Sequence, residues 1–88
     1  DEEFKSLLKE AQKDFQEAIR IDPTFTKSYI NLACVYDLMD NWQGAIGKIN
    51  ELSIEQQNSV DAKRILAIAY YHYGQETKAE ELWNSIKY

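Results

Sequence analysis

Apolar residues recur along this chain at steps of three and four, which is the spacing of one face of an α-helix. The pattern of residues 2–20 contains no helix breaker, and its apolar positions are Phe4, Leu7, Leu8, Ala11, Phe15, Ala18 and Ile19. This helix should end near Asp22 and Pro23, because proline disfavours the helical conformation in the preceding residue and has no N–H to donate. Thr24 or Thr26 is then expected to cap the next helix.

Four further stretches carry a helical pattern and are expected at residues 26–39, 42–54, 60–73 and 76–87. The first of them is apolar almost all round, which is typical of a helix that packs between neighbours. Gly44 and Gly47 cost helix propensity of about 1 kcal/mol each, which suggests close approach of a neighbouring backbone. Asp40 and Asn41 supply a turn and a cap, the run 55–59 is a polar connector, and Gly74 is a helix stop. With no strand pattern, the predicted class is all-α with five helices.

The helical pattern repeats after 34 residues. Identical or similar residues at this offset are Ala11/Ala45/Ala79, Leu32/Leu66, Ala33/Ala67, Tyr36/Tyr70, Phe15/Ile49/Trp83 and Ala18/Leu52/Ile86. Small residues permit helices to cross closely, and large ones fill the space between helices. The offset therefore indicates a repeated pair of helices.

These positions resemble the tetratricopeptide repeat family. Residues 26–59 follow the family pattern through Tyr29, Leu32, Ala33, Tyr36, Ala45, Ile49 and Leu52. Residues 60–88 repeat most of it, residues 1–25 resemble the end of an earlier unit, and departures occur at Gln57, Lys63 and Glu76. The resemblance implies one domain of about two and a half repeats, built as a right-handed α-solenoid of antiparallel helix pairs. It also implies a fragment of a longer protein.

In this family the first helix of each unit lines a concave groove. The binding residues implied by the resemblance are Lys27, Ile30, Asn31, Cys34, Leu38, Arg64, Ile65, Ile68, Tyr71 and His72, and Asp37 and Asp61 map to the same strip. The centre of the strip is apolar and its margins are polar, which suits an extended or helical peptide. The first hypothesis is therefore a non-enzymatic interaction module that binds a protein or peptide segment. Alternatively, other parts of a longer parent protein cover the strip.

Co-chaperone members of the family hold a C-terminal carboxylate with lysine, asparagine and arginine side chains. Asn31 matches one of these positions, whereas Asp61 and Ile65 stand where two others are expected. An aspartate there would repel a carboxylate. This binding mode is therefore not expected.

Cys34 is the only cysteine and His72 the only histidine of the chain. A thiol–imidazole pair also needs an orienting group and an oxyanion site, for which the sequence offers no candidate. Two ligands are too few for a structural zinc site. We therefore expect no catalytic residue, metal or cofactor, a buried Cys34 and a partly exposed His72. Tyr70 and Tyr73 are expected on the core side of their helix.

The last predicted helix supports a rival hypothesis. Leu82, Trp83 and Ile86 lie on a face that another helix normally covers, and repeat arrays need a polar capping end. Either more protein follows, or this face pairs with a second copy. In the second case the chain is a structural unit that forms a homodimer within a larger assembly.

Composition and charge narrow the classes of partner. The 88 residues carry a net charge of −5, and no segment is net basic, so nucleic-acid binding is not expected. No apolar run approaches the roughly 20 residues that cross a bilayer, so membrane insertion is not expected. A single cysteine excludes an internal disulfide framework, which slightly favours a cytoplasmic over a secreted location.

Overall fold

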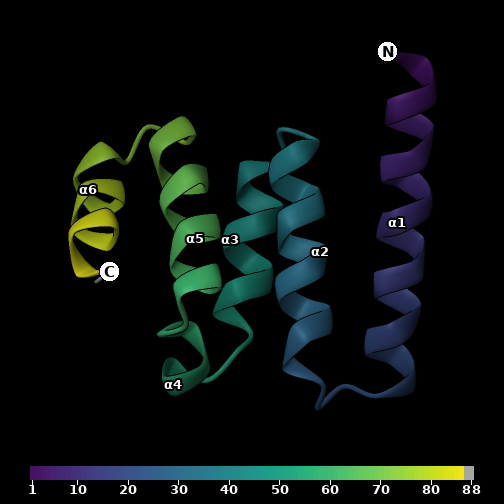
Figure 1. Ribbon diagram of the computed structural model, residues 1–88, viewed down its shortest axis with the longest axis horizontal. Coiled ribbons are helices and arrows are strands. Elements are labelled where there is room, and N and C mark those ends of the chain that lie inside the picture. Colours follow the sequence, from purple (N-terminus) through teal and green to yellow (C-terminus); the bar gives the residue numbers. More distant parts are fainter. Residues whose placement is uncertain (87–88) are drawn as a thin grey trace.

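A computed structural model of the chain describes residues 1–86. The helices within this range are α1 (Glu2–Ile21), α2 (Thr26–Leu38), α3 (Trp42–Asn50), α4 (Ile54–Gln57), α5 (Val60–His72) and α6 (Glu76–Ser85). The long helices stand in a row in chain order, each antiparallel to the one before it (Figure 1). The described residues contain no strand, so the predicted all-α class is confirmed, and the fold is a helical solenoid.

The predicted number of five helices is wrong, because the connector after α3 contains the short helix α4. The Ser53 hydroxyl accepts a hydrogen bond from the Gln56 backbone N–H at 3.1 Å, and the Gln56 side chain accepts one from the Ser53 N–H at 3.0 Å. This reciprocal capping box starts a new helix. As a result α3 ends at Asn50 rather than at the predicted residue 54.

The turn between α1 and α2 follows the prediction at its start and departs from it at its end. Helix α1 ends at Ile21, directly before Asp22. The Asp22 carboxylate accepts hydrogen bonds from the Thr24 hydroxyl and backbone N–H at 2.6 and 3.1 Å. Thr26 in turn accepts one from the Gln56 side chain at 2.6 Å. With both threonines engaged, Phe25 is the N-terminal cap of α2 without a side-chain hydrogen bond, so the predicted threonine cap is wrong.

The two following helix pairs have the same turn geometry 34 residues apart. Asp40 and Gly74 both adopt positive φ, at 60° and 90°. The next residue in each case, Asn41 or Gln75, donates its N–H to a tyrosine carbonyl at 2.8 Å. The sequence repeat therefore corresponds to a repeat in backbone structure. The unit boundaries at 1–25, 26–59 and 60–88 stay a prediction.

The core lies where α2, α3 and α5 meet. Leu32 and Ile49 are its largest fully buried side chains, and Ala33, Ala45 and Ala67 are also fully buried. The small alanines let the helices approach, as predicted from the repeat, and the large side chains fill the space between them.

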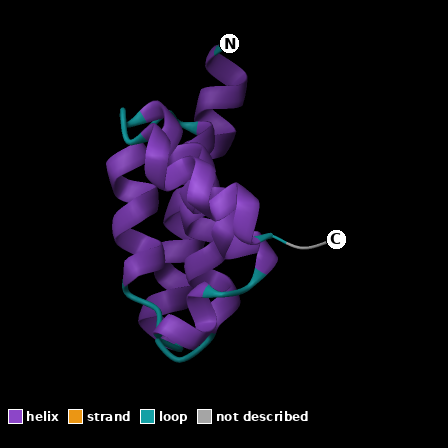
Figure 2. Cartoon of the chain, turned by 90° about the vertical axis from the view of Figure 1, so that its left-hand side faces the viewer, coloured by secondary structure: helices purple, strands orange, loops and turns teal. Residues whose placement is uncertain are grey.

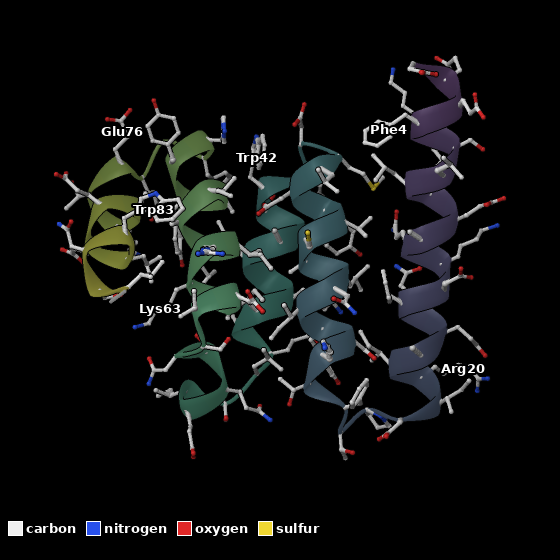
Figure 3. All side chains as sticks on the ribbon, in the orientation of Figure 1. Phe4, Arg20, Trp42, Lys63, Glu76 and Trp83 are labelled. Carbon is white, nitrogen blue, oxygen red and sulfur yellow. The ribbon has the colours of Figure 1, made fainter. Side chains whose placement is uncertain are left out.

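The two ends of the row are less well covered than its centre. On α1 only Leu8 is buried, and the N-terminal end of this helix extends beyond the others (Figure 2). Phe4 of α1 and Trp83 of α6 each lie on the side of their helix that faces the neighbouring helix (Figure 3). Both side chains are more than two-fifths exposed. Among the described residues no helix combines the length and the hydropathy that a membrane span requires.

The sequence predicted that a neighbouring backbone lies close to Gly44 and Gly47. This prediction is wrong for Gly47, and at Gly44 the close group is the side chain of Asn41. A Cβ at Gly47 would have no neighbour within 4 Å, whereas one at Gly44 would lie 2.5 Å from Nδ2 of Asn41. Asn41 caps α3 by accepting a hydrogen bond from the Gly44 N–H at 3.0 Å. Gly44 thus makes room for the cap of its own helix.

We predict opposite outcomes for alanine at these two glycines. Gly47→Ala should raise the free energy of unfolding by about 0.5–1 kcal/mol, because alanine loses less backbone entropy in a helix. Gly44→Ala should show no such gain, because displacing the Asn41 cap costs about 1 kcal/mol. Urea unfolding measures both variants. Equal stabilisation by the two changes would contradict the assigned role of Gly44.

Candidate functional site

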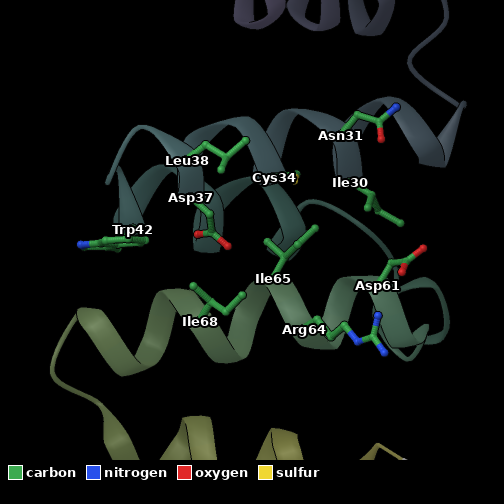
Figure 4. A pocket seen from close by; sticks show the side chains of 10 residues that line it. All are labelled: Ile30, Asn31, Cys34, Asp37, Leu38, Trp42, Asp61, Arg64, Ile65 and Ile68. Atoms are coloured by element: carbon green, nitrogen blue, oxygen red, sulfur yellow. The ribbon is translucent and has the colours of Figure 1, made fainter. Parts of the chain in front are cut away.

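A hollow of about 420 Å³ lies on the surface between α2 and α5. It is lined by Ile30, Asn31, Cys34, Asp37, Leu38, Trp42, Asp61, Arg64, Ile65 and Ile68. We call this site the α2–α5 hollow. Figure 4 shows that side chains of the two helices face each other across it, with Trp42 of α3 at one end and Asp61 and Arg64 at the other.

The α2–α5 hollow brings together most of the predicted groove residues. Lys27, Tyr71 and His72 do not line it. Lys27 borders an adjoining hollow that shares Ile30, Asn31 and Asp61 with the first. Tyr71 borders a separate hollow against α6.

Trp42 is the lining residue that the sequence patterns missed. The predicted strip took positions only from the first helix of each unit, whereas Trp42 opens α3, the second helix. Its ring stacks on His72 of α5, with the ring centroids 4.2 Å apart and an angle of 12° between the planes. The Tyr71 ring meets the His72 ring edge-on, with the centroids 5.3 Å apart. His72 therefore contributes indirectly, by holding Trp42 at the end of the hollow.

Apolar side chains make up the centre of the α2–α5 hollow. Ile65 is only 8% exposed and belongs to the core, whereas Ile68 and Leu38 are 38% and 55% exposed. Ile68 lies three residues beyond Ile65, nearly one helical turn further along α5. The same helix therefore contributes one isoleucine to the core and presents another to solvent. Leu38 and Ile68 are therefore the most exposed aliphatic side chains of the strip.

Asp37 is the exceptional polar group of the α2–α5 hollow. Its carboxylate points from α2 towards α5, near Trp42 and Ile68 (Figure 4). Its Oδ1 atom is buried and has no hydrogen-bond partner among the described residues. Burial raises the pKa of Asp37 from its ordinary value of 3.8 to about 7. Low-dielectric surroundings disfavour the charged form, and no neighbouring cation opposes this effect.

Cys34 lies beside Asp37 on the exposed side of α2, so the predicted buried cysteine is wrong. Its pKa is raised, first by burial of the sulfur and then by the carboxylates of Asp37 and Asp61. A raised pKa keeps the thiol protonated, whereas a nucleophile needs the thiolate. His72 stacks on Trp42, so no thiol–imidazole pair forms. In the described part of the chain no three His, Cys, Asp or Glu side chains gather as a metal site.

The family model for the tetratricopeptide repeat matches residues 14–47, from the middle of α1 through α2 into α3. This match supports the assignment to the tetratricopeptide repeat family. No curated protein and no solved structure matches it. Tetratricopeptide repeats generally serve as protein-interaction modules.

Burial at the end of the chain's last described helix, α6, corrects part of the predicted self-association face. Ile86 is 7% exposed, and Leu82 packs against the core. Only Trp83 of the three is largely exposed, at 42%. It lies on the side of α6 that faces α5, where it borders a hollow with Tyr71 and Ala79 (Figure 3).

The tyrosines near the end of α5 also differ from the prediction. Tyr70 packs against the core as expected, whereas Tyr73 is 48% exposed. Tyr73 is the C-terminal cap of α5, so the helical spacing that places Tyr70 inwards no longer applies at this residue.

We predict that Asp37 makes the stability of this repeat array depend on pH. Its pKa in the folded state lies above the ordinary value, so the folded state binds more protons between pH 3.8 and about 7. The free energy of unfolding should therefore fall as the pH rises through this window. Asp37→Asn should flatten this fall and stabilise the fold by about 1 kcal/mol at about pH 8, because it removes a half-buried carboxylate that lacks a partner and that solvent partly screens.

Urea unfolding at a series of pH values measures this effect. Asp14→Asn is the matched control, because Asp14 is exposed on α1 and its replacement makes the same change of charge. The control should keep the pH slope of the natural chain. An unchanged slope in Asp37→Asn would refute the role of Asp37.

Proposed function

We propose that this chain is a non-enzymatic module that binds a peptide or protein segment in the α2–α5 hollow. The observation that supports this function is the exposed apolar surface of Leu38 and Ile68, set in a concave site between two helices. Exposed apolar surface in a concave site is typical of recognition sites, because burying it on a partner is favourable. The match of residues 14–47 to a family of protein-interaction modules supports the same function.

The size and polarity of the site suit a short segment of chain. A volume of about 420 Å³ accommodates a few side chains rather than a folded domain. Asn31 and Arg64 lie at one end, where they are available to hydrogen-bond a peptide backbone or side chain. The bound segment would therefore place apolar side chains between α2 and α5 and polar groups at the Asn31 end.

We predict that Leu38→Glu and Ile68→Glu each weaken binding at least tenfold, because each places a charge on the apolar contact surface. Dodecapeptides selected from a random phage-display library on the natural chain serve as probes, and fluorescence polarisation measures their dissociation constants. Ile65 is unsuitable for this test, because it belongs to the core and glutamate there would unfold the chain.

Ile54→Glu is the matched control, because Ile54 is 81% exposed at the start of α4, outside the α2–α5 hollow. The control should bind the selected peptides like the natural chain. Failure to select any peptide, or equal binding by all three glutamate variants, would refute the proposed function.

Self-association is the second candidate, and the exposed Trp83 beside Tyr71 is the observation in its favour. Glu76 and Glu80 border the same hollow, and like charges of two copies would repel there. If copies pair through this surface, Trp83→Glu should convert dimers to monomers in sedimentation-velocity experiments at about 0.1 mM. A natural chain that sediments as a monomer at this concentration would exclude this candidate.

A further inference from the structure

We propose that the α2–α5 hollow recognises a lysine or arginine side chain of its partner, with Asp37 as the residue that pairs with the cation. The inference rests on the proposed function, because it names the chemistry of the segment that the same site would bind. The methylene stem of such a side chain would lie on Leu38 and Ile68. Its charged end would reach the carboxylate between Trp42 and α5.

The first argument is the unpartnered Oδ1 atom of Asp37. Among the described residues it is the buried side-chain nitrogen or oxygen atom without a hydrogen-bond partner. Buried polar atoms in folded proteins nearly always have such a partner, and an exception calls for an explanation. The Asp37 side chain lines the α2–α5 hollow, so rotation of its carboxyl group about the Cβ–Cγ bond would turn this oxygen towards a donor of a bound segment, which could supply the missing bond.

The second argument is the balance of charge around the α2–α5 hollow. Its lining contains two carboxylates, on Asp37 and Asp61, and one cation, on Arg64. The ion pairs of the described residues are Lys5–Glu2, Arg20–Glu17 and Lys48–Glu51, and all lie elsewhere. Arg64 lies beside Asp61 at the far end from Trp42 (Figure 4). The Asp37 end therefore has negative charge available and no cation of its own to balance it.

The third argument is the apolar surface beside the carboxylate. Long basic side chains bury their methylene groups on apolar surface while the charged end reaches a polar partner. Leu38, Ile68 and Trp42 provide such a surface around Asp37. An aliphatic alcohol would satisfy Oδ1 without balancing the charge, and an acidic side chain would be repelled. A basic side chain supplies both a hydrogen-bond donor for Oδ1 and a positive charge that balances the carboxylate.

Protonation of Asp37 provides a signature of this pairing. Its pKa of about 7 means that a cation must displace a proton below this pH. The other titratable groups that line the α2–α5 hollow are Cys34 of α2 and Asp61 and Arg64 of α5. Helix α3 contributes only the uncharged Trp42, and α1 contributes no lining residue. Beyond Trp42, His72 of α5 stacks on the indole ring.

Hexylammonium chloride is a suitable probe, because it reproduces the stem and charge of lysine and stays charged across the pH range of the test. Two-dimensional ¹H–¹⁵N NMR titrations of the natural chain would follow the amides of α2 and α5. At about pH 8 we expect hexylammonium to bind at least tenfold more tightly than 1-hexanol or hexanoate. Its affinity should fall by up to about tenfold for each pH unit below 7. Equal binding of hexylammonium and 1-hexanol, or affinity independent of pH, would overturn the inference.

Three variants assign the effect to Asp37. Asp37→Asn should remove both the preference for the cation and the pH dependence, whereas Asp14→Asn should keep both. His72→Gln should also keep the pH dependence, because His72 does not line the α2–α5 hollow. Loss of the pH dependence in His72→Gln would overturn the assignment. The experiment on the natural chain needs no variant, so it stays decisive even if a variant unfolds.

The selected dodecapeptides separate this inference from the proposed function. Enrichment of lysine or arginine, with binding weakened at least tenfold by Asp37→Asn, supports both. Peptides that bind through Leu38 and Ile68 without a basic residue overturn the inference and leave the proposed function standing. Specific binding of hexylammonium without any selected peptide would support recognition of a cation by Asp37 and would refute the proposed binding of a peptide.

Discussion

Close packing of helices against fully buried alanines is the constraint on which the rest of the structure depends. Ala33 on α2, Ala45 on α3 and Ala67 on α5 are all 0% exposed. A methyl side chain at a crossing point lets two helices approach until Leu32 and Ile49 fill the remaining space. Any larger residue at these alanines would separate the helices and leave gaps around the large side chains. Because these alanines recur at an offset of 34 residues, the same close packing recurs along the chain.

The α2–α5 hollow follows from this packing. Both α2 and α5 pack on α3, and they also contact each other. The residues of these helices that turn away from α3 are not needed for the core, so they are free to line a concave surface. Ile65 and Ile68 show the division within one helix, since the first is 8% exposed and the second 38%. The site is therefore held in place by the same helices that form the core.

Local signals predicted the long helices and most of their ends. Pro23, Asn41 and Gly74 act through their own backbone or the next few residues, so a single stretch of sequence is enough to interpret them. The cap of α2 could not be predicted, because Gln56 takes the Thr26 hydroxyl from 30 positions away. The capping box of α4 is a local signal, from Ser53 to Gln56, and the polar composition of residues 55–59 concealed it.

The residues of the α2–α5 hollow also divide into those that could be predicted from the sequence and those that could not. The family resemblance implied that Ile30, Cys34 and Ile68 lie on one surface, and all three line the α2–α5 hollow. The position of Trp42 depends on how α3 stacks against α5, and the burial of Ile86 depends on the extended backbone of this residue at the C-terminal cap of α6. Neither is encoded in the spacing along one helix. Asp37 had a visible signal, a lone acid within the apolar run from Val35 to Met39, whose meaning depended on its burial.

Asp37 is the position where local sequence and global structure conflict. Elsewhere in α2 the buried residues are apolar or small, as a helix between two neighbours requires. An asparagine would fit the same space without a buried charge, so the carboxylate lowers stability in the unbound chain. Natural sequences break such local rules mainly where function requires it. The same feature that makes the isolated array less stable at neutral pH thus supplies an unsatisfied acceptor, which a cationic partner would satisfy on binding.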